Sequence, residues 1–382
     1  MLRARYAYIA FANGYSFGVI GPAVAQMSID FSVGLAAVGF LSTAMYLVHA
    51  GMQLPSAGPI QRYGSLRVAR WGFGAIVIAN GLAAIAPGFG LLLASRLLVG
   101  VGTAPSFVGS MNAARQTGGA ALAGLFGGLT LLASGSAILL GSALADADVS
   151  WRWNFVVAAL LAIGAVLICP KDVPGAISTT ASGVVEPMRA ALATGRLWRL
   201  ALLYAATFGT SFVLGAWIVE YIAPGASGKQ IAGLVGFVIL GASAGFRWYG
   251  GVLSDRGLSW NLLGPGATLV AATALGVFAL TRSPLVAFPL AIVLGFGLAL
   301  PFGAIFNAAV DAQRAHPAAA IAMVNMSASI FAMVVLPIVG YAFDEGAAWS
   351  MPAGLAAVAV IAALVNLRRV ASRQATRRSD LE

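Results

Sequence analysis

A few side chains that can carry charge lie inside long apolar stretches of this sequence. Arg247 is the clearest case, because no Asp or Glu lies within two helical turns upstream of it. A guanidinium can donate two parallel hydrogen bonds to a planar oxyanion such as nitrate or a carboxylate. This pattern predicts an anion site at Arg247. The alternatives are that Arg247 extends to the membrane surface or joins a charge network with Asp255.

His49 and Gln53 form a second candidate pair. They are four residues apart, so they lie on one face of a helix. We expect Gln53 to help Arg247 hold the solute. Histidine has an unperturbed pKa of about 6.5, so His49 could exchange a proton near neutral pH. The alternative is a neutral His49 that is hydrogen-bonded to a neighbouring helix.

Uncharged polar residues in other apolar stretches could line a cavity or form hydrogen bonds between helices. They are Asn13, Tyr46, Tyr204, Thr207, Asn307 and Asn325. We assign three of them to solute binding: Tyr46, Asn307 and Asn325. Glu220 and Tyr221 are expected to form an interfacial pair or to gate an entrance.

The composition is that of a membrane protein that crosses the bilayer several times. Hydrophobic residues make up 60% and charged residues 9%, against roughly 45–50% and about 25% in soluble domains. The net charge of +10 comes from bases in separate loops and the tail, so a nucleic-acid partner is not expected. One cysteine and two histidines exclude an intramolecular disulfide and argue against a zinc centre.

No nucleotide-binding loop and no catalytic constellation can be found in the sequence. We therefore expect no enzyme activity and no cofactor, and we infer no obligatory protein partner. The expected partners are the lipid bilayer and a small, anionic solute. The energy for moving that solute must come from an ion or solute gradient.

Apolar runs broken by Gly, Pro or charged residues predict twelve membrane spans. They are approximately 6–28, 33–56, 68–86, 90–112, 119–144, 153–169, 199–222, 230–252, 260–280, 285–309, 318–342 and 349–366. The longest polar interruption divides them six and six. We predict an N-terminal six-helix bundle (1–169), a cytoplasmic linker (170–198), a C-terminal six-helix bundle (199–366) and a basic cytoplasmic tail (367–382).

The basic residues predict the orientation. All Lys and Arg except five fall on segments of one side when both termini are placed in the cytoplasm, the exceptions being Arg96, Arg152, Lys229, Arg247 and Arg282. The first apolar stretch begins like a signal peptide, but no convincing cleavage site follows it, so we expect a retained helix. The expected location is the bacterial inner (plasma) membrane.

Two loops repeat one pattern at an offset of 194 residues. Arg247-Trp-Tyr-Gly-Gly251-Val-Leu-Ser-Asp255-Arg256 matches Gln53-Leu-Pro-Ser-Ala-Gly-Pro-Ile-Gln-Arg62-Tyr-Gly64, with Gln61 in place of the acid. The first pattern resembles the loop motif G-x-L-x-D-R-x-G-R of the major facilitator superfamily. Arg96 to Gly102 resembles the R-x-x-x-G-x-G element of its helix 4, and Trp151-Arg-Trp-Asn-Phe155 resembles its usual entry to helix 6.

This resemblance implies an all-α membrane protein with twelve transmembrane helices in two pseudo-symmetric bundles. It implies a secondary transporter in which the two bundles rock around a central cavity. The repeated loops would latch the inner gate through residues Arg62, Gly64, Gly251, Asp255 and Arg256. Arg96 would brace the interior of its helix or serve the coupling step.

Arg247 and the residues after it resemble more narrowly the nitrate and nitrite porters, in which this arginine contacts the anion. A second arginine of those porters corresponds to Gln53, so one cationic clamp is missing. We therefore expect transport of a small anion, either an inorganic oxyanion or a carboxylate. The alternatives are proton-coupled efflux of a drug or metabolite, and a membrane sensor or assembly factor that binds a solute without transporting it.

Overall fold

The computed structural model describes residues 2–53, 55–170, 185–225, 228–256 and 260–379. All regular secondary structure in this part of the chain is helical. Nine of the described helical segments are long and apolar enough to cross a membrane, and the apolar helix α7 is shorter. The predicted all-α membrane protein is thereby confirmed.

Helices cover each of the first six predicted spans. The elements are α1 (Leu2–Gly18), η1 (Gly21–Ala23), α2 (Val24–Phe31), α3 (Leu35–Gln53), α4 (Ala57–Tyr63), α5 (Ser65–Ala84), α6 (Phe89–Asp146) and α7 (Arg152–Ile168). The first span is divided into three elements at Gly21-Pro22, because proline has no N–H to continue the helical hydrogen bonds.

Helices also cover the last six predicted spans. The elements are α8 (Val185–Ala193), α9 (Gly195–Tyr204), η2 (Ala205–Gly209), α10 (Thr210–Ile222), α11 (Lys229–Asp255), α12 (Trp260–Leu280), α13 (Pro284–Ala299), α14 (Phe302–Ala312), α15 (Pro317–Asp344) and α16 (Ser350–Ser379). One turn of π-helix, η2, joins α9 to α10 within a single span. The span at 285–309 is divided next to Pro301, where α13 gives way to α14.

Several segments differ from the predicted loops. The short helices α4 and α8 lie where loops were expected, and α16 continues as a helix past the predicted end of the last span. The chain also stays helical from the fourth span into the fifth, so α6 runs through the predicted loop at 113–118. It turns back at Gly118 and Gly119, where φ of +64° at Gly119 favours a residue without a Cβ.

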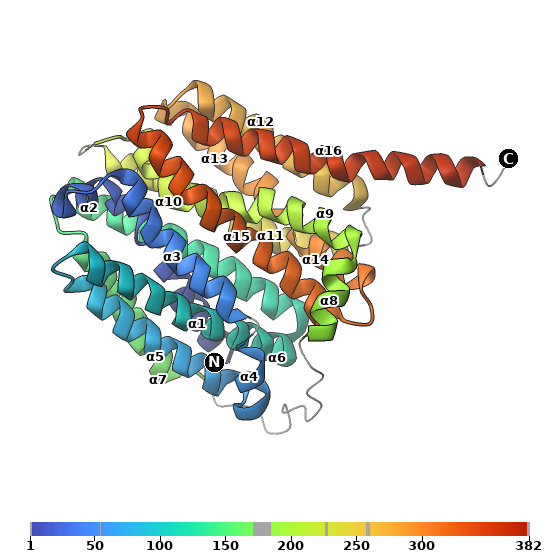
Figure 1. Ribbon diagram of the computed structural model, residues 1–382, viewed down its shortest axis with the longest axis horizontal. Coiled ribbons are helices and arrows are strands. Elements are labelled where there is room, and N and C mark those ends of the chain that lie inside the picture. The colour runs from blue at the N-terminus through green and yellow to red at the C-terminus, as the bar shows by residue number, and fades with distance from the viewer. Residues whose placement is uncertain (1, 54, 171–184, 226–227, 257–259, 380–382) are drawn as a thin grey trace.

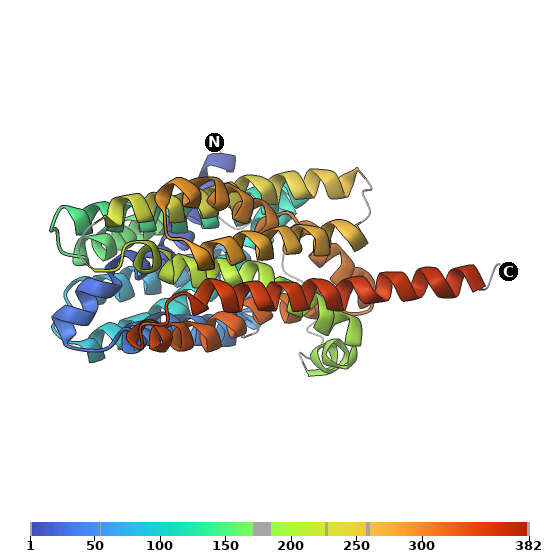
Figure 2. The same cartoon turned by 90° about the horizontal axis from the view of Figure 1, so that it is seen from above.

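The membrane-spanning helices lie side by side along the long axis of the molecule (Figure 1). The second view shows α2 and the turn after α6 at one end, and α8 and the projecting end of α16 at the other (Figure 2). We call the first the outer end and the second the inner end, following the predicted orientation. The orientation and the division of the chain into two halves remain predictions.

Small residues let α1 and α6 approach closely inside the bundle. A Cβ on Gly14 would lie 2.1 Å from the carbonyl oxygen of Thr130, and a Cβ on Gly18 would lie 2.1 Å from that of Ser134. The G-x-x-x-G spacing of these glycines therefore serves packing within the chain. Large apolar side chains such as Leu280 and Leu285, each 87% exposed, cover the outside. Such a surface suits a lipid solvent.

Candidate functional site

A cavity lies in the middle of the bundle, between helices of both predicted halves. Its free space is about 430 Å³, including the part that is open to solvent. The lining combines uncharged polar side chains with aromatic rings: Asn13, Phe17, His49, Gln53, Phe107, Thr130, Leu131, Ser134, Phe208, Phe212, Asn325 and Ser329. None of these lining residues is an acid.

Three of the predicted solute-binding residues line this cavity: His49, Gln53 and Asn325. Tyr46 lies beside it, with its ring 5.8 Å from the ring of Phe17 and 4.6 Å from that of Phe212, both of which line the cavity. Asn307, on α14, is not among the residues that line this cavity.

The sequence did not single out the cavity's aromatic wall. The ring of Phe212 on α10 stacks on that of Phe17 on α1, with centroids 6.1 Å apart, and packs at a tilt against that of Phe208 in η2, with centroids 4.4 Å apart. Phenylalanine in an apolar helix has the same sequence pattern whether it faces lipid, core or cavity. A π-helical turn such as η2 often marks a functional site, but its position cannot be read from residue types, so the sequence offered no usable signal.

His49 is held by a polar cluster in the first half of the chain. Its Nδ1 lies 3.0 Å from Oγ1 of Thr103, and its side chain is buried. Asn13 donates hydrogen bonds to the carbonyl of Thr103 (3.2 Å) and to Oγ of Ser106 (2.7 Å). These contacts match the alternative of a histidine that is hydrogen-bonded to a neighbouring helix. Proton coupling through His49 remains a prediction.

Gln53 and Asn325 connect the two predicted halves at the inner side of the cavity. Nδ2 of Asn325 on α15 donates to Oε1 of Gln53 on α3, at 3.0 Å. The Tyr204 hydroxyl on α9 donates to Oδ1 of Asn325 at 3.3 Å, and Tyr204 lies close to the guanidinium of Arg247. A chain of hydrogen bonds therefore runs from Gln53 through Asn325 to Tyr204, beside the predicted anion-binding arginine.

Arg247 lies directly behind the aromatic wall of the cavity. The carbon at the centre of its guanidinium is 4.1 Å from the centroid of the Phe208 ring and 4.0 Å from that of the Phe302 ring. Nη1 donates a long hydrogen bond of 3.4 Å to the carbonyl of Gly127, and Nε has no partner. The side chain is 5% exposed, so it does not reach the membrane surface.

No carboxylate within the described residues forms an ion pair with Arg247. The Asp255 side chain, which was the predicted alternative partner, lies outside the described residues. Among the described residues, two aromatic faces and a carbonyl contact the cation, and Tyr204 lies close to it. Cation–π contacts of this kind stabilise a charge that is out of water, but they do not neutralise it.

Arg96 is a second arginine inside the bundle. It is fully buried, and its Nη2 donates to the carbonyl of Ser16 at 3.0 Å and lies 2.8 Å from the sulfur of Met45. The guanidinium also lies over the ring of Phe155 at 5.7 Å. These contacts join α6 to α1, α3 and α7, as expected of a residue that braces the helix interior.

The inner latch remains a prediction, because the described contacts of its residues do not test it. Arg62 and Arg256 are exposed, and the guanidinium of Arg62 lies over the ring of Tyr63 at 5.1 Å. Gly64 separates α4 from α5 with φ of +93°, and Gly251 lies near the end of α11. The side chains of Asp255 and Gln61 lie outside the described residues.

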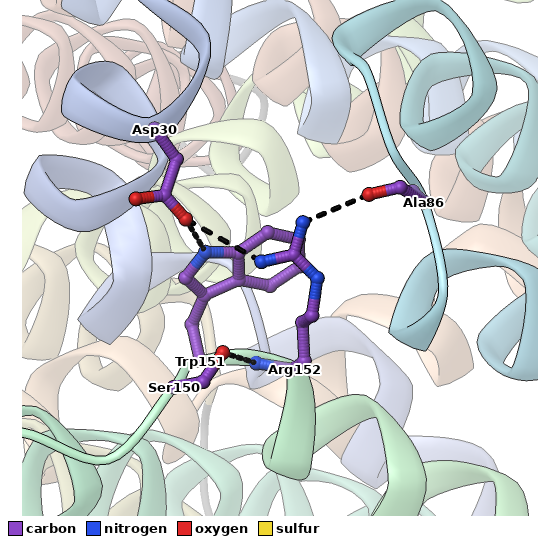
Figure 3. A network of polar contacts seen from close by, with 5 residues as sticks. All are labelled: Asp30, Ala86, Ser150, Trp151 and Arg152. Carbon is purple, nitrogen blue, oxygen red and sulfur yellow. Dashed lines mark hydrogen bonds and ion pairs between the residues drawn. The ribbon is translucent and has the colours of Figure 1, made fainter.

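The Trp151 motif anchors the outer end of the first half (Figure 3). Nε1 of Trp151 donates to Oδ2 of Asp30 at 2.8 Å, and Nη1 of Arg152 forms an ion pair with the same oxygen at 3.4 Å. Nη2 of Arg152 donates to the carbonyl of Ala86 at 2.8 Å. The start of α7 is thereby tied to α2 and to the turn before α6.

Another tie at the outer end joins α10 to α11. Nζ of Lys229 lies 2.6 Å from Oε2 of Glu220, and both side chains are buried. Tyr221 donates to the carbonyl of Phe278, and Arg282 lies over the Tyr221 ring at 4.9 Å. Glu220 and Tyr221 therefore each have a partner of their own and do not pair with one another.

The family model of the Major Facilitator Superfamily matches residues 6–334. Solved structures with a similar fold include a bacterial homolog of the human lysosomal transporter Spinster in an inward-facing and occupied conformation. Its TM-score is 0.74 at 17% sequence identity, and the match covers 97% of this chain and 96% of that chain. A D-xylose-proton symporter has a TM-score of 0.73, 14% identity and coverage of 96% of each chain. No curated protein sequence matches the chain. These results support the superfamily and not the narrower resemblance to nitrate and nitrite porters.

Proposed function

Because the chain belongs to the major facilitator superfamily and is a secondary transporter rather than an enzyme, we propose that its solute is a small anion held by Arg247. Alternating access of the central cavity would carry the solute across the membrane. The predicted orientation places both chain termini in the cytoplasm of a bacterial cell.

The charge of Arg247, which has no carboxylate partner among the described residues, supports this proposal most directly. A cation that is 95% buried and has no carboxylate partner among the described residues is costly in a bilayer. A bound anion would supply the missing negative charge. The unpartnered Nε and the long bond from Nη1 leave donors that such an anion could use.

The cavity lining supports a solute with a polar body. Gln53, Asn325 and Ser329 offer uncharged donors and acceptors, while Phe208 lines the cavity and contacts Arg247 through its ring. The same lining favours a second candidate, an uncharged polar solute that never reaches the arginine. Efflux of a cation is less well supported, because none of the described residues that line the cavity is acidic.

Ligand binding to the full-length protein separates these candidates. Thermal stability in detergent would be measured with nitrate, formate, acetate, lactate, sulfate and phosphate, and each stabilising anion would then be tested for counterflow in proteoliposomes. We expect Arg247→Lys to weaken binding about tenfold, because a point charge replaces a bidentate fork. Arg247→Gln should abolish binding, and Arg282→Lys, at an exposed arginine of the outer end, should leave it unchanged.

Equal affinity in Arg247→Gln and the unaltered protein would remove Arg247 as the anion ligand. Binding of uncharged solutes alone would favour the second candidate. Binding without counterflow would indicate a sensor instead of a transporter.

A further inference from the structure

Two aspartates at the outer end cap helices that belong to the opposite half of the chain. Oδ1 of Asp146 accepts a hydrogen bond from the backbone N–H of Lys229 at 2.9 Å, and its Oδ2 accepts one from Gln230 at 2.7 Å. Asp344 does the same at the start of α3, accepting from Leu35 at 2.8 Å and from Ala36 at 2.9 Å.

Each carboxylate meets a helix start that is well suited to it. The first N–H groups of a helix have no partner within the helix, and they carry the positive end of its dipole. Neither α3 nor α11 has an acidic residue in its own first turn. The negative charge therefore comes from the end of another helix, α15 for α3 and α6 for α11.

The two contacts are equivalent under the internal repeat. Leu35 and Lys229 are 194 residues apart, which is the offset of the repeated loops, and Asp146 and Asp344 are 198 apart. The small shift indicates a slightly different spacing in the later helices of each half. One arrangement of carboxylate and helix start is thus used twice.

Close helix contacts lie beside both carboxylates and follow the same offsets. A Cβ on Gly39 would lie 3.1 Å from the carbonyl oxygen of Leu336, and a Cβ on Gly233 would lie 3.2 Å from that of Ile138. Gly39 and Gly233 are 194 residues apart, and Ile138 and Leu336 are 198 apart. Each aspartate therefore closes the end of a tight pairing between the halves, α3 with α15 and α6 with α11.

We propose that Asp146 and Asp344 are paired latches that hold the outer end of the bundle closed, and that releasing both together opens the cavity to that side. In a rocking motion the two halves separate as rigid bodies, so α3 cannot leave α15 while α6 stays on α11. The two carboxylate contacts must then break in one step. This inference does not depend on the identity of the solute.

Cysteine labelling of the full-length protein tests the proposal. The reporter is Thr43→Cys in a Cys169→Ala background, because Thr43 is partly buried in the α3–α15 pairing and donates to the carbonyl of Met333 at 3.3 Å. The labelling rate with a maleimide would be measured in Asp146→Asn, Asp344→Asn and the double variant. The neighbouring exposed acids Asp148 and Glu345 provide matched controls as Asp148→Asn and Glu345→Gln.

Each single latch variant should label about three to thirty times faster than the unaltered protein, since each loses a charged helix cap. The double variant should show the product of the two single effects, because one opening step breaks both contacts. Both control variants should label at the original rate.

The decisive variant is Asp146→Asn, because its latch lies on the other helix pair from the reporter. An increase with Asp344→Asn alone would mean that α3 frays locally, and the concerted latch would be wrong. Unchanged rates in both single variants would show that neither carboxylate holds the outer end closed. Equal increases of the labelling rate in the two control variants would show that the effect comes from general surface charge, and would also overturn the proposal.

Discussion

The buried ion pair between Lys229 and Glu220 allows a sharp test of how the outer end is stabilised. The two charged atoms lie 2.6 Å apart, and the side chains are 3% and 7% exposed. Oε1 of Glu220 also accepts a hydrogen bond from the backbone N–H of Gly225 at 3.3 Å. Replacing Glu220 by Gln keeps the shape of the side chain but leaves the ammonium of Lys229 buried without its anion.

We expect Glu220→Gln to lower the free energy of unfolding by about 3 to 5 kcal/mol, because one charge of a buried pair is left uncompensated. Lys229→Met should have a similar effect, since it leaves the carboxylate alone. The double variant should be less destabilised than either single variant, because no unpaired charge remains and the two side chains keep nearly the same volume.

The assay is a double-mutant cycle on the full-length protein in detergent, with unfolding followed by the intrinsic fluorescence of its eight tryptophans. Backbone contacts of Lys229 with Asp146 are unaffected by side-chain replacement, so they are constant around the cycle. A loss below about 1 kcal/mol in both single variants would refute the reasoning, since that is the range of exposed pairs. The reasoning would also be refuted if the double variant lost as much free energy of unfolding as the two single variants together.

Three further predictions concern other parts of the molecule. Gly14→Ala should cost about 1 to 3 kcal/mol of stability, because its Cβ would lie 2.1 Å from a carbonyl oxygen. The control is Gly81→Ala, whose Cβ would meet nothing within 4 Å and which should be neutral or stabilising in thermal unfolding. Asp30→Ala should lower stability by about 1 to 3 kcal/mol, since a partly buried indole N–H and a guanidinium lose their shared acceptor, and denaturation in detergent should show this. Tyr204→Phe should weaken anion binding about threefold to tenfold without a comparable loss of stability, because it removes a hydroxyl that lies close to the guanidinium of Arg247; unchanged affinity in a thermal-shift titration would show that this hydroxyl does not help to bind the anion.

The sequence alone determined the class of fold. Apolar runs long enough to cross a bilayer must become helices there, because lipid offers no hydrogen-bond partner to the backbone. For this reason the predicted spans fall on helices, although α16 runs on past the predicted end of the last span, and the turn between the fourth and fifth spans falls at Gly118 and Gly119. The short helices α4 and α8 were missed, since the same residues could form either a loop or a surface helix.

The sequence also selected part of the cavity. Gln53, His49 and Asn325 stand out because polar side chains are rare in apolar spans, and all three line it. Phe208 and Phe212 could not be selected, since an aromatic ring in an apolar helix gives no sign of which way it faces.

The tertiary structure decided the surroundings of Arg247 and the closure of the outer end. Whether Arg247 meets an acid, a ring or water depends on which helices come beside α11, and α9, η2 and α14 supply Tyr204, Phe208 and Phe302. Asp146 and Asp344 look like ordinary acids at helix ends in the sequence. They become caps only because packing brings them within 3 Å of helix starts on the opposite half, and contacts between residues so distant in the chain are set by helix packing rather than by local residue type.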